Sequence, residues 1–257
     1  MPGWFLLTAA AAYGLVLGSF LNVVIYRLPR GMSIVRPRSH CPACGRMVRW
    51  YDNVPILSYL ALRGRCRSCG APISPRYPLV EATTGCLLVL AAWRFGVTIE
   101  GGLAAVFLLL LLPLALIDLE HQILPDVLTL PGIALGLLGG ALSARVPLWN
   151  SIAGALLGAA VPYLVIVAYR LLRGVEGMGL GDVKLLAMIG AFLGWQGVLL
   201  TLCIGAVAGA AVGLVLIAAR RGRLDTELPF GTFLAAAGAL VLFAGGPIMV
   251  MLGWIAP

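Results

Sequence analysis

The sequence contains few charged residues for its length. Only 11% of its 257 residues are Asp, Glu, Lys or Arg, whereas soluble domains carry about 25%. A chain of this size would lack the polar residues that a water-exposed surface requires. Because 61% of the residues are hydrophobic, we predict a protein that crosses a lipid bilayer several times.

Several common catalytic patterns are also missing. The chain has two histidines, no HExxH motif and no Ser/His/Asp set that can be assembled with them, which argues against the corresponding metalloproteases and serine hydrolases. No GxGxxG follows a strand, so a Rossmann-type cofactor site is not predicted. No internal repeat or low-complexity tract is evident. Acidic side chains remain as the candidates for catalysis.

The apolar residues are grouped into runs long enough for membrane helices. A span requires about 20 apolar residues, and shorter runs can cross when they are tilted or kinked. The first run is expected to be a retained helix, because no basic residues precede it and no small-residue cleavage site follows. We predict an all-α polytopic membrane protein with about eight transmembrane helices, at residues 4–27, 79–95, 102–118, 126–143, 149–172, 182–195, 197–219 and 230–254.

The basic residues are distributed unevenly. Of the 18 Lys and Arg residues, ten lie in the polar segment 28–78 or at its border. With the N-terminus outside, sixteen fall on the cytoplasmic side, including those near loops 173–181 and 220–229, and two on the other side, which fits the positive-inside rule. Nucleic-acid binding is the alternative explanation, but membrane orientation accounts for the pattern, so no nucleic-acid partner is predicted. The predicted parts are a first transmembrane helix (1–27), a cytoplasmic module (28–78) and a seven-helix catalytic domain (79–257).

The cytoplasmic module contains two CxxC pairs, each followed by glycine. Their spacing is typical of a zinc knuckle, in which four thiolates surround one Zn²⁺ and leave no position open for water. We therefore predict a structural Zn²⁺ site; a redox role is the alternative, although one pair would suffice for it. Disulfides are not expected in the reducing cytoplasm. The predicted metal ligands are Cys41, Cys44, Cys66 and Cys69.

Three aspartates lie at the ends of predicted membrane helices, where carboxylates are costly and usually functional. Asp118 ends the third span. Asp126 begins the fourth after a proline, where it could be functional or could cap the helix. Asp182 follows Gly179 and Gly181, which offer a backbone that an extended peptide can approach closely. Asp182 could alternatively serve only as a helix cap.

The charge distribution places Asp118 and Asp182 at the same cytoplasmic level. Two carboxylates that face each other share one proton near neutral pH. The ionised group can then activate a water while the protonated group donates to a peptide carbonyl. We predict an aspartyl protease with these two catalytic residues. The rival hypotheses are a proton-coupled transporter, in which the acids form a relay, and a non-enzymatic, zinc-bearing membrane scaffold.

Five ordered motifs resemble those of the bacterial prepilin peptidases, the type IV leader peptidases of the GxGD aspartyl protease group. The resemblance extends over nearly the whole chain. The motifs are residues 18–29 (GSFLNVVIYRLP), the two CxxC pairs, 76–81 (RYPLVE), 117–126 (IDLEHQILPD) and 179–185 (GLGDVKL).

The resemblance implies an enzyme of the bacterial inner membrane, multi-pass, with its active site facing the cytoplasm. Its substrates would be type IV prepilins or type II secretion pseudopilins, cleaved after a glycine that precedes an apolar segment lying in the lipid bilayer. The catalytic residues would be Asp118 and Asp182. Many family members also methylate the new N-terminus with S-adenosyl-L-methionine, and Glu81 is a candidate for binding that cofactor or for orienting neighbouring groups, with pairing to Arg76 or Arg27 as the alternative.

Overall fold

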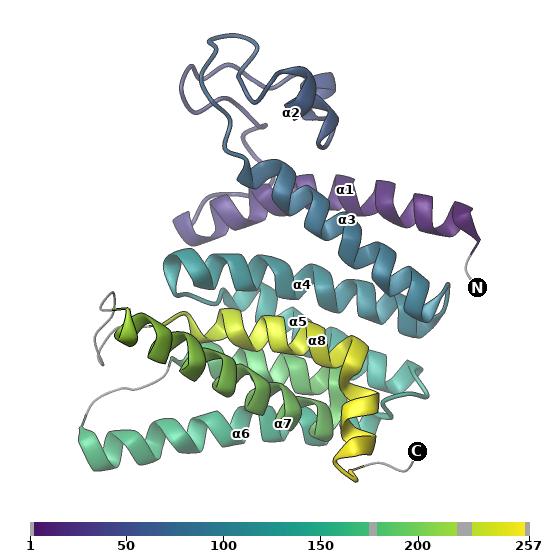
Figure 1. Ribbon diagram of the computed structural model, residues 1–257, viewed down its shortest axis with the longest axis vertical. Coiled ribbons are helices and arrows are strands. Elements are labelled where there is room, and N and C mark those ends of the chain that lie inside the picture. Colours follow the sequence, from purple (N-terminus) through teal and green to yellow (C-terminus); the bar gives the residue numbers. More distant parts are fainter. Residues whose placement is uncertain (1–2, 175–178, 220–227, 255–257) are drawn as a thin grey trace. The chain divides into compact units, whose positions relative to one another are not determined.

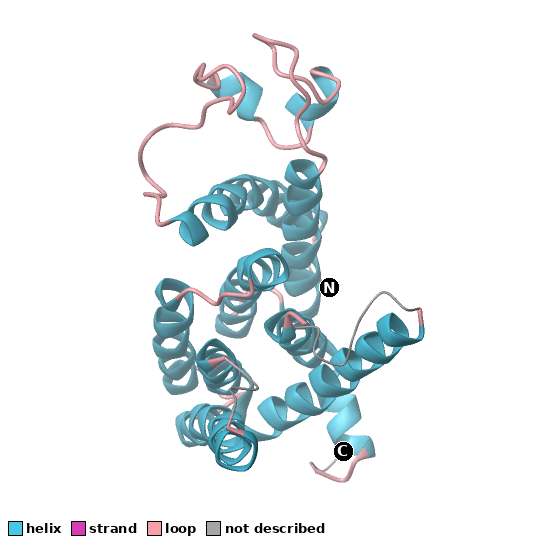
Figure 2. Cartoon of the chain, turned by 90° about the vertical axis from the view of Figure 1, so that its left-hand side faces the viewer, coloured by secondary structure: helices cyan, strands magenta, loops and turns pink. Residues whose placement is uncertain are grey.

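The computed structural model describes residues 3–174, 179–219 and 228–254. Within these ranges the regular elements are all helices, and the only β pairing consists of two isolated bridges, His40 with Met47 and Arg65 with Pro72 (Figure 2). The predicted all-α fold is therefore confirmed. Part of the charge count falls on Arg220, Arg221 and Arg223, which lie outside the described residues.

The helices follow the predicted apolar runs closely (Figure 1). Among the described helices, six are long and apolar enough to cross a membrane, and α5 is a shorter apolar helix. The polar segment 28–78 contains only the short helices η1, η2 and α2. The bounds are α1 Trp4–Arg27, η1 Leu28–Arg30, η2 Trp50–Asn53, α2 Leu57–Ala61, α3 Arg76–Phe95, α4 Ile99–His121, α5 Asp126–Leu142, α6 Leu148–Arg173, α7 Leu180–Ala218 and α8 Phe230–Met251.

The chain forms two compact units, Met1–Gly101 and Gly102–Pro257. The first unit contains α1, α3 and the cysteine-rich segment, and the second contains nearly all of α4 and helices α5 to α8. The division into parts 1–27, 28–78 and 79–257 concerns the membrane boundary and stays a prediction.

In the first unit, α1 and α3 run antiparallel and touch through small residues. A Cβ atom at Gly14 would lie 2.7 Å from the Cα of Gly85, and one at Gly18 would lie 2.7 Å from the Cα of Glu81. One turn further along, the buried Asn22 amide donates to the Tyr77 carbonyl at 3.1 Å. Small residues four apart thus bring the two backbones together, as in other membrane helix pairs.

In the second unit, glycines also fix the direction of each helix relative to its neighbours. Successive contacts show that the first half of α7 is antiparallel to α6 and parallel to α5, and that α8 is antiparallel to α4 and to the second half of α7. The end of α4 and the starts of α5, α7 and α8 therefore lie at one end of the unit. The contacts pair Gly154 with Gly190, Gly158 with Leu186, Gly132 with Met188, Gly136 with Ala191, Gly132 with Leu110, Gly139 with Leu103, Gly238 with Leu111, Gly231 with Asp118, Gly205 with Leu234 and Gly209 with Phe230.

Helix α7 is interrupted at Gly194. Its 39 residues would be about 58 Å long if straight, roughly twice the thickness of a hydrocarbon core. Gly194 has φ 74° and ψ −179°, and the Asn150 side chain accepts the Trp195 N–H at 2.9 Å. Because the two halves of α7 run oppositely against α8, the chain reverses there. The two predicted spans, 182–195 and 197–219, correspond to these halves.

The α6–α7 contact allows a stability test. A Cβ at Gly154 would overlap the Gly190 carbonyl oxygen, so Gly154→Ala should destabilise the fold by about 1–3 kcal/mol through overpacking. Gly102→Ala is the matched control, because a Cβ at this exposed position meets nothing within 4 Å. Thermal unfolding in detergent measures both; equal midpoints for the two variants would contradict the close packing.

Candidate active site

Asp118 lies three residues before the end of α4 and is only 5% exposed. Its Oδ2 accepts the backbone N–H of Thr232 at 2.6 Å, and the Thr232 hydroxyl lies 3.1 Å from the same oxygen and 2.9 Å from the Ala115 carbonyl. Thr232 belongs to the first turn of α8, whose N–H groups have no partner within the helix. The Asp118 carboxylate therefore satisfies the N-terminus of α8, and the helix dipole favours its negative charge.

Asp182 is the third residue of α7 and is 8% exposed. The backbone N–H of Gly179, the residue that precedes the helix, acts electrostatically on the Asp182 carboxylate. This arrangement resembles half of a capping box, in which an acid at the third helical position reaches back to the N-cap amide. The capping role of Asp182 stays a prediction, and the charge of Asp118 also acts on the same carboxylate.

The structure brings Asp118 and Asp182 to the same end of the second unit. They are close enough for the charge of Asp118 to act on Asp182. Leu124 links their surroundings: a Cβ at Gly181, next to Asp182, would lie 3.0 Å from the Leu124 Cβ, and one at Gly231 would lie 2.9 Å from its Cδ1. That Gly231 Cβ would also lie 3.0 Å from the Asp118 carboxylate.

Asp126 makes a separate ion pair. Its two carboxylate oxygens accept hydrogen bonds from the Lys184 ammonium at 2.6 and 2.8 Å. Asp126 is the first residue of α5, and the preceding Pro125 offers no side-chain cap. The ion pair therefore fastens the start of α5 to the start of α7, beside the two aspartates.

Sequence reasoning did not identify Thr232, Leu124 or the Lys184–Asp126 pair. Thr232 is one polar residue at the beginning of an apolar run, after Pro229, and only this signal of a helix start could have directed attention to it. Leu124 carries no polar group, so its position between two glycines is visible only in the folded chain.

The four cysteines of the first unit form one cluster, as predicted. Their Sγ atoms all lie within 4.8 Å of one another, and Cys41 and Cys69 are 3.9 Å apart. Four thiolates around Zn²⁺ at about 2.3 Å would be separated by roughly 3.8 Å. The cluster could therefore hold a tetrahedral metal ion after a small contraction.

The two CxxC turns have the same backbone structure, displaced by 25 positions. Cys41 and Cys66 each donate an N–H across the turn, to Arg46 and Ala71, and each accepts the N–H of the glycine that follows its pair. Those glycines have φ 69° and 73°, which only glycine adopts readily. A short structural repeat is thus present where none was evident from the sequence.

The second CxxC turn contains thiols with shifted pKa values and an arginine that forms an ion pair. The backbone N–H groups of Ser68 and Cys69 lower the pKa of the Cys66 thiol to about 7, which favours the thiolate that binds metal, whereas burial and the neighbouring cysteines raise the pKa of the Cys69 thiol to about 11. Arg67 donates to both oxygens of Asp52, at 2.7 to 3.1 Å. This ion pair ties η2 to the second CxxC turn.

Glu81 lies in α3 and is 7% exposed. Its Oε2 accepts the backbone N–H of Ile56 at 2.8 Å, and the Ser19 hydroxyl acts electrostatically on the same carboxylate. Arg27, one predicted partner, instead donates to the Ser33 and Pro37 carbonyls at 2.9 and 2.8 Å. Glu81 thus anchors the cysteine-rich segment to the helix pair.

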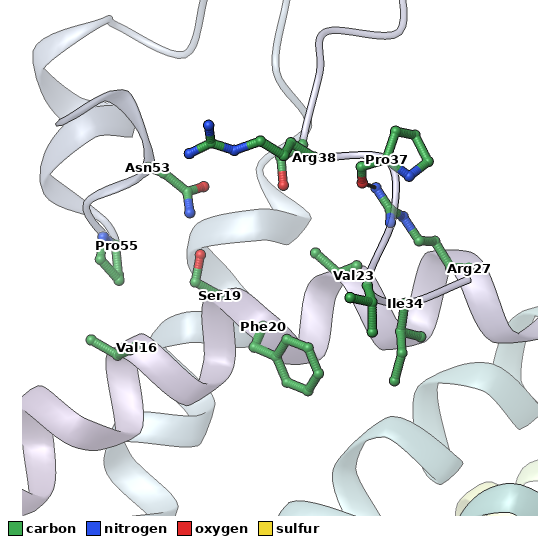
Figure 3. Close-up of a pocket in the computed structure, with 12 residues that line it drawn as sticks. Val16, Ser19, Phe20, Val23, Arg27, Ile34, Pro37, Arg38, Asn53 and Pro55 are labelled. Carbon is green, nitrogen blue, oxygen red and sulfur yellow. Dashed lines mark hydrogen bonds between the residues drawn. The ribbon is translucent and has the colours of Figure 1, made fainter. Parts of the chain in front are cut away.

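A cavity of about 430 Å³ lies within the first unit, between α1 and the cysteine-rich segment (Figure 3). Val16, Phe20 and Val23 form its apolar side, and Ser19, Asn53 and Arg38 bring polar groups to it. Ser19 lines this cavity and also acts electrostatically on Glu81.

The chain matches two protein-family descriptions in sequence order. Residues 12–95 match the bacterial peptidase A24 N-terminal domain, and residues 105–214 match the type IV leader peptidase family. The second match includes both Asp118 and Asp182. No solved protein structure matches the chain.

Relatives of known name are similar over nearly the whole length. A prepilin leader peptidase/N-methyltransferase of Pseudomonas putida is 41% identical over 96% of this chain and 93% of its own length. Proteins with the same name from Burkholderia pseudomallei strain 1026b and Myxococcus xanthus are 42% and 48% identical, over 98% and 83% of this chain and 90% and 64% of theirs. The aspartate pair, the four-cysteine cluster and these matches agree, and the chain belongs to the type IV leader peptidase family.

Proposed function

We propose that this protein cleaves the leader peptide of type IV prepilins or type II secretion pseudopilins, with Asp118 and Asp182 as the catalytic pair, and then methylates the new N-terminus. The observation that carries the peptidase assignment is that both buried carboxylates lie at one end of the second unit, next to the two glycines that enclose Leu124. The names of the relatives support the choice of substrate and the second activity.

The hydrolysis requires one proton shared between the two carboxylates. The ionised carboxylate takes a proton from water as the water oxygen bonds to the carbonyl carbon, and the other carboxyl group donates its proton to the carbonyl oxygen. The carbon–nitrogen bond then breaks, and the departing amine takes the proton that the first carboxylate gained from water. The backbone N–H of Thr232 holds the Asp118 carboxylate in place, and the backbone N–H of Gly179 acts electrostatically on Asp182.

The substrate follows from the position of this pair. The aspartates lie at the ends of apolar helices, so an apolar stem in the lipid with its basic leader in the cytoplasm would place the scissile bond beside them. The proposed location is the bacterial inner membrane, with segment 28–78 and the catalytic end of the bundle cytoplasmic, because this orientation assigns sixteen of the eighteen basic residues to the cytoplasmic side, as the positive-inside rule requires.

We also propose that Cys41, Cys44, Cys66 and Cys69 bind one structural Zn²⁺. Four converging thiol groups and two matching turns suit this ion, and a complete set of four protein ligands leaves no position for a reacting water. Its contribution would be to hold the two CxxC turns together.

S-Adenosyl-L-methionine, when bound, would supply an electrophilic methyl group to the free amine of the cleaved product. The cavity in the first unit has side chains that suit parts of this molecule: Arg38 for its carboxylate, Ser19 and Asn53 for hydroxyl and ring nitrogen groups, and Phe20 for an apolar face (Figure 3). Glu81 would act on this cavity through Ser19 and Ile56 rather than by direct contact.

The catalytic pair is tested with isosteric amides. Asp118→Asn and Asp182→Asn should each lower prepilin cleavage about 10²-fold to 10⁴-fold, because each removes one partner of general acid–base catalysis. Asp126→Asn is the matched control and should retain most activity, since its carboxylate pairs with Lys184. Cleavage of a purified prepilin in detergent measures the effect, and full activity in both catalytic variants would refute the assignment.

The metal site is tested by ligand removal. The double variant Cys41→Ser, Cys69→Ser should lose its zinc, about one ion per chain by the proposal, and segment 28–78 should become more sensitive to limited proteolysis. Cys86→Ser serves as the control, because Cys86 lies outside the cluster. Unchanged zinc content and digestion rate in the double variant would show that the cysteines are not ligands.

The role of Glu81 is tested by binding. Glu81→Ala removes the acceptor of the Ile56 N–H and should weaken S-adenosyl-L-methionine binding about tenfold, as expected for one lost hydrogen bond to a charged group. Glu81→Gln keeps an acceptor oxygen and should retain most affinity. Equilibrium binding of the labelled compound is the measurement. Equal affinity of the wild type and Glu81→Ala would exclude a role in shaping that site.

A further inference from the structure

Leu124 lies in the short connection between α4 and α5, directly beside the two aspartates. The connection begins after His121 and ends at Pro125, and Leu124 is half-buried. A Cβ at Gly231 would lie 2.9 Å from the Leu124 Cδ1 and 3.0 Å from the Asp118 Oδ2, so the leucine methyl and that carboxylate oxygen are within about 6 Å of each other.

Two glycines allow Leu124 to approach so closely. A side chain at Gly181 would meet the Cβ, Cγ and Cδ1 of Leu124 at 3.0 to 3.5 Å, and a side chain at Gly231 would meet both Leu124 and Asp118. Neither glycine has a positive φ, so lack of space, not backbone conformation, explains the requirement for glycine here. Leu124 thus lies between two backbone surfaces, each next to one of the aspartates.

Both ends of the connection are held. On the α4 side, the Gln122 N–H donates to the Asp118 carbonyl at 2.8 Å. On the α5 side, Asp126 is paired with Lys184, which lies two residues after Asp182. The position of Leu124 is therefore fixed relative to both carboxylates by contacts to the same two helices.

We propose that Leu124 determines the specificity of cleavage, by excluding any side chain on the substrate residue that precedes the scissile bond. This inference rests on the proposed peptidase function. The carbonyl that is attacked belongs to that residue, and it must come within hydrogen-bonding distance of the aspartates. A side chain on the same residue would then compete with the Leu124 methyl groups for the space beside Asp118. Glycine, which has no side chain, meets no such obstacle.

The experiment compares two substrates with three enzymes. A prepilin with glycine before the scissile bond and the same prepilin with alanine there are cleaved in detergent by the wild type, Leu124→Ala and Ile123→Ala. The ratio of kcat/KM for the glycine and alanine substrates is the readout. In Leu124→Ala this ratio should fall at least tenfold, the lower end of the discrimination that one methylene provides in a packed site.

Ile123→Ala is the matched control, because it removes the same kind of side chain one position away, from a residue that is exposed. It should keep the wild-type ratio. An unchanged ratio in Leu124→Ala, with the wild type cleaving the glycine substrate normally, would overturn the role of Leu124 and leave the peptidase intact. Failure of the wild type to cleave either substrate would instead refute the peptidase function itself.

If Leu124→Ala is inactive or poorly folded, Leu124→Val provides a smaller change. Its ratio of kcat/KM for the glycine and alanine substrates should lie between the wild-type ratio and the tenfold lower ratio expected for Leu124→Ala. Thermal unfolding in detergent shows separately whether a variant is poorly folded. A ratio in Leu124→Val equal to that of the wild type would again contradict the proposal.

Discussion

Close approach of helix backbones is the constraint on which the rest of this structure depends. Lipid chains are as apolar as leucine, so membrane helices gain little from burying apolar side chains and associate through tight packing instead. Here glycines on α5, α6, α7 and α8 meet neighbouring backbones or side chains with no room for a Cβ. Such contacts set the register of each helix pair. The register in turn places the end of α4 and the starts of α7 and α8 at the same level.

Because these helix ends lie at the same level, each buried acid is close to backbone N–H groups at the start of a helix. A carboxylate out of water needs donors, and the first turn of a helix has N–H groups without partners. Asp118 accepts such an N–H from α8, and the amide that precedes α7 acts electrostatically on Asp182. The N–H groups at the helix starts and the carboxylates therefore compensate each other's burial, and the two acids lie at the same end of the unit.

Much of this arrangement could be predicted from the sequence, because hydropathy and local motifs determine it. The apolar runs predicted the helix positions within a few residues, and the two CxxC pairs predicted a four-cysteine cluster. The partners of the acids could not be predicted in this way. Thr232 and Lys184 lie more than 50 residues from Asp118 and Asp126 respectively, and only the register of packed helices brings them together. The same holds for Leu124, whose role depends on two distant glycines.

The position of the two aspartates along their helices also distinguishes a peptidase from a transporter. Asp118 is three residues from the end of α4 and Asp182 is the third residue of α7, so each lies within about 5 Å of a helix end at 1.5 Å per residue. The first half of α7, from Leu180 to Leu193, is about 21 Å long, so Asp182 lies near its end and not near its middle. A transporter places its coupling acids near the middle of the bilayer, where both sides can reach them in turn. A pair at one rim, bordered by glycines and a fixed leucine, suits an extended peptide that enters from water with an apolar stem still in the membrane.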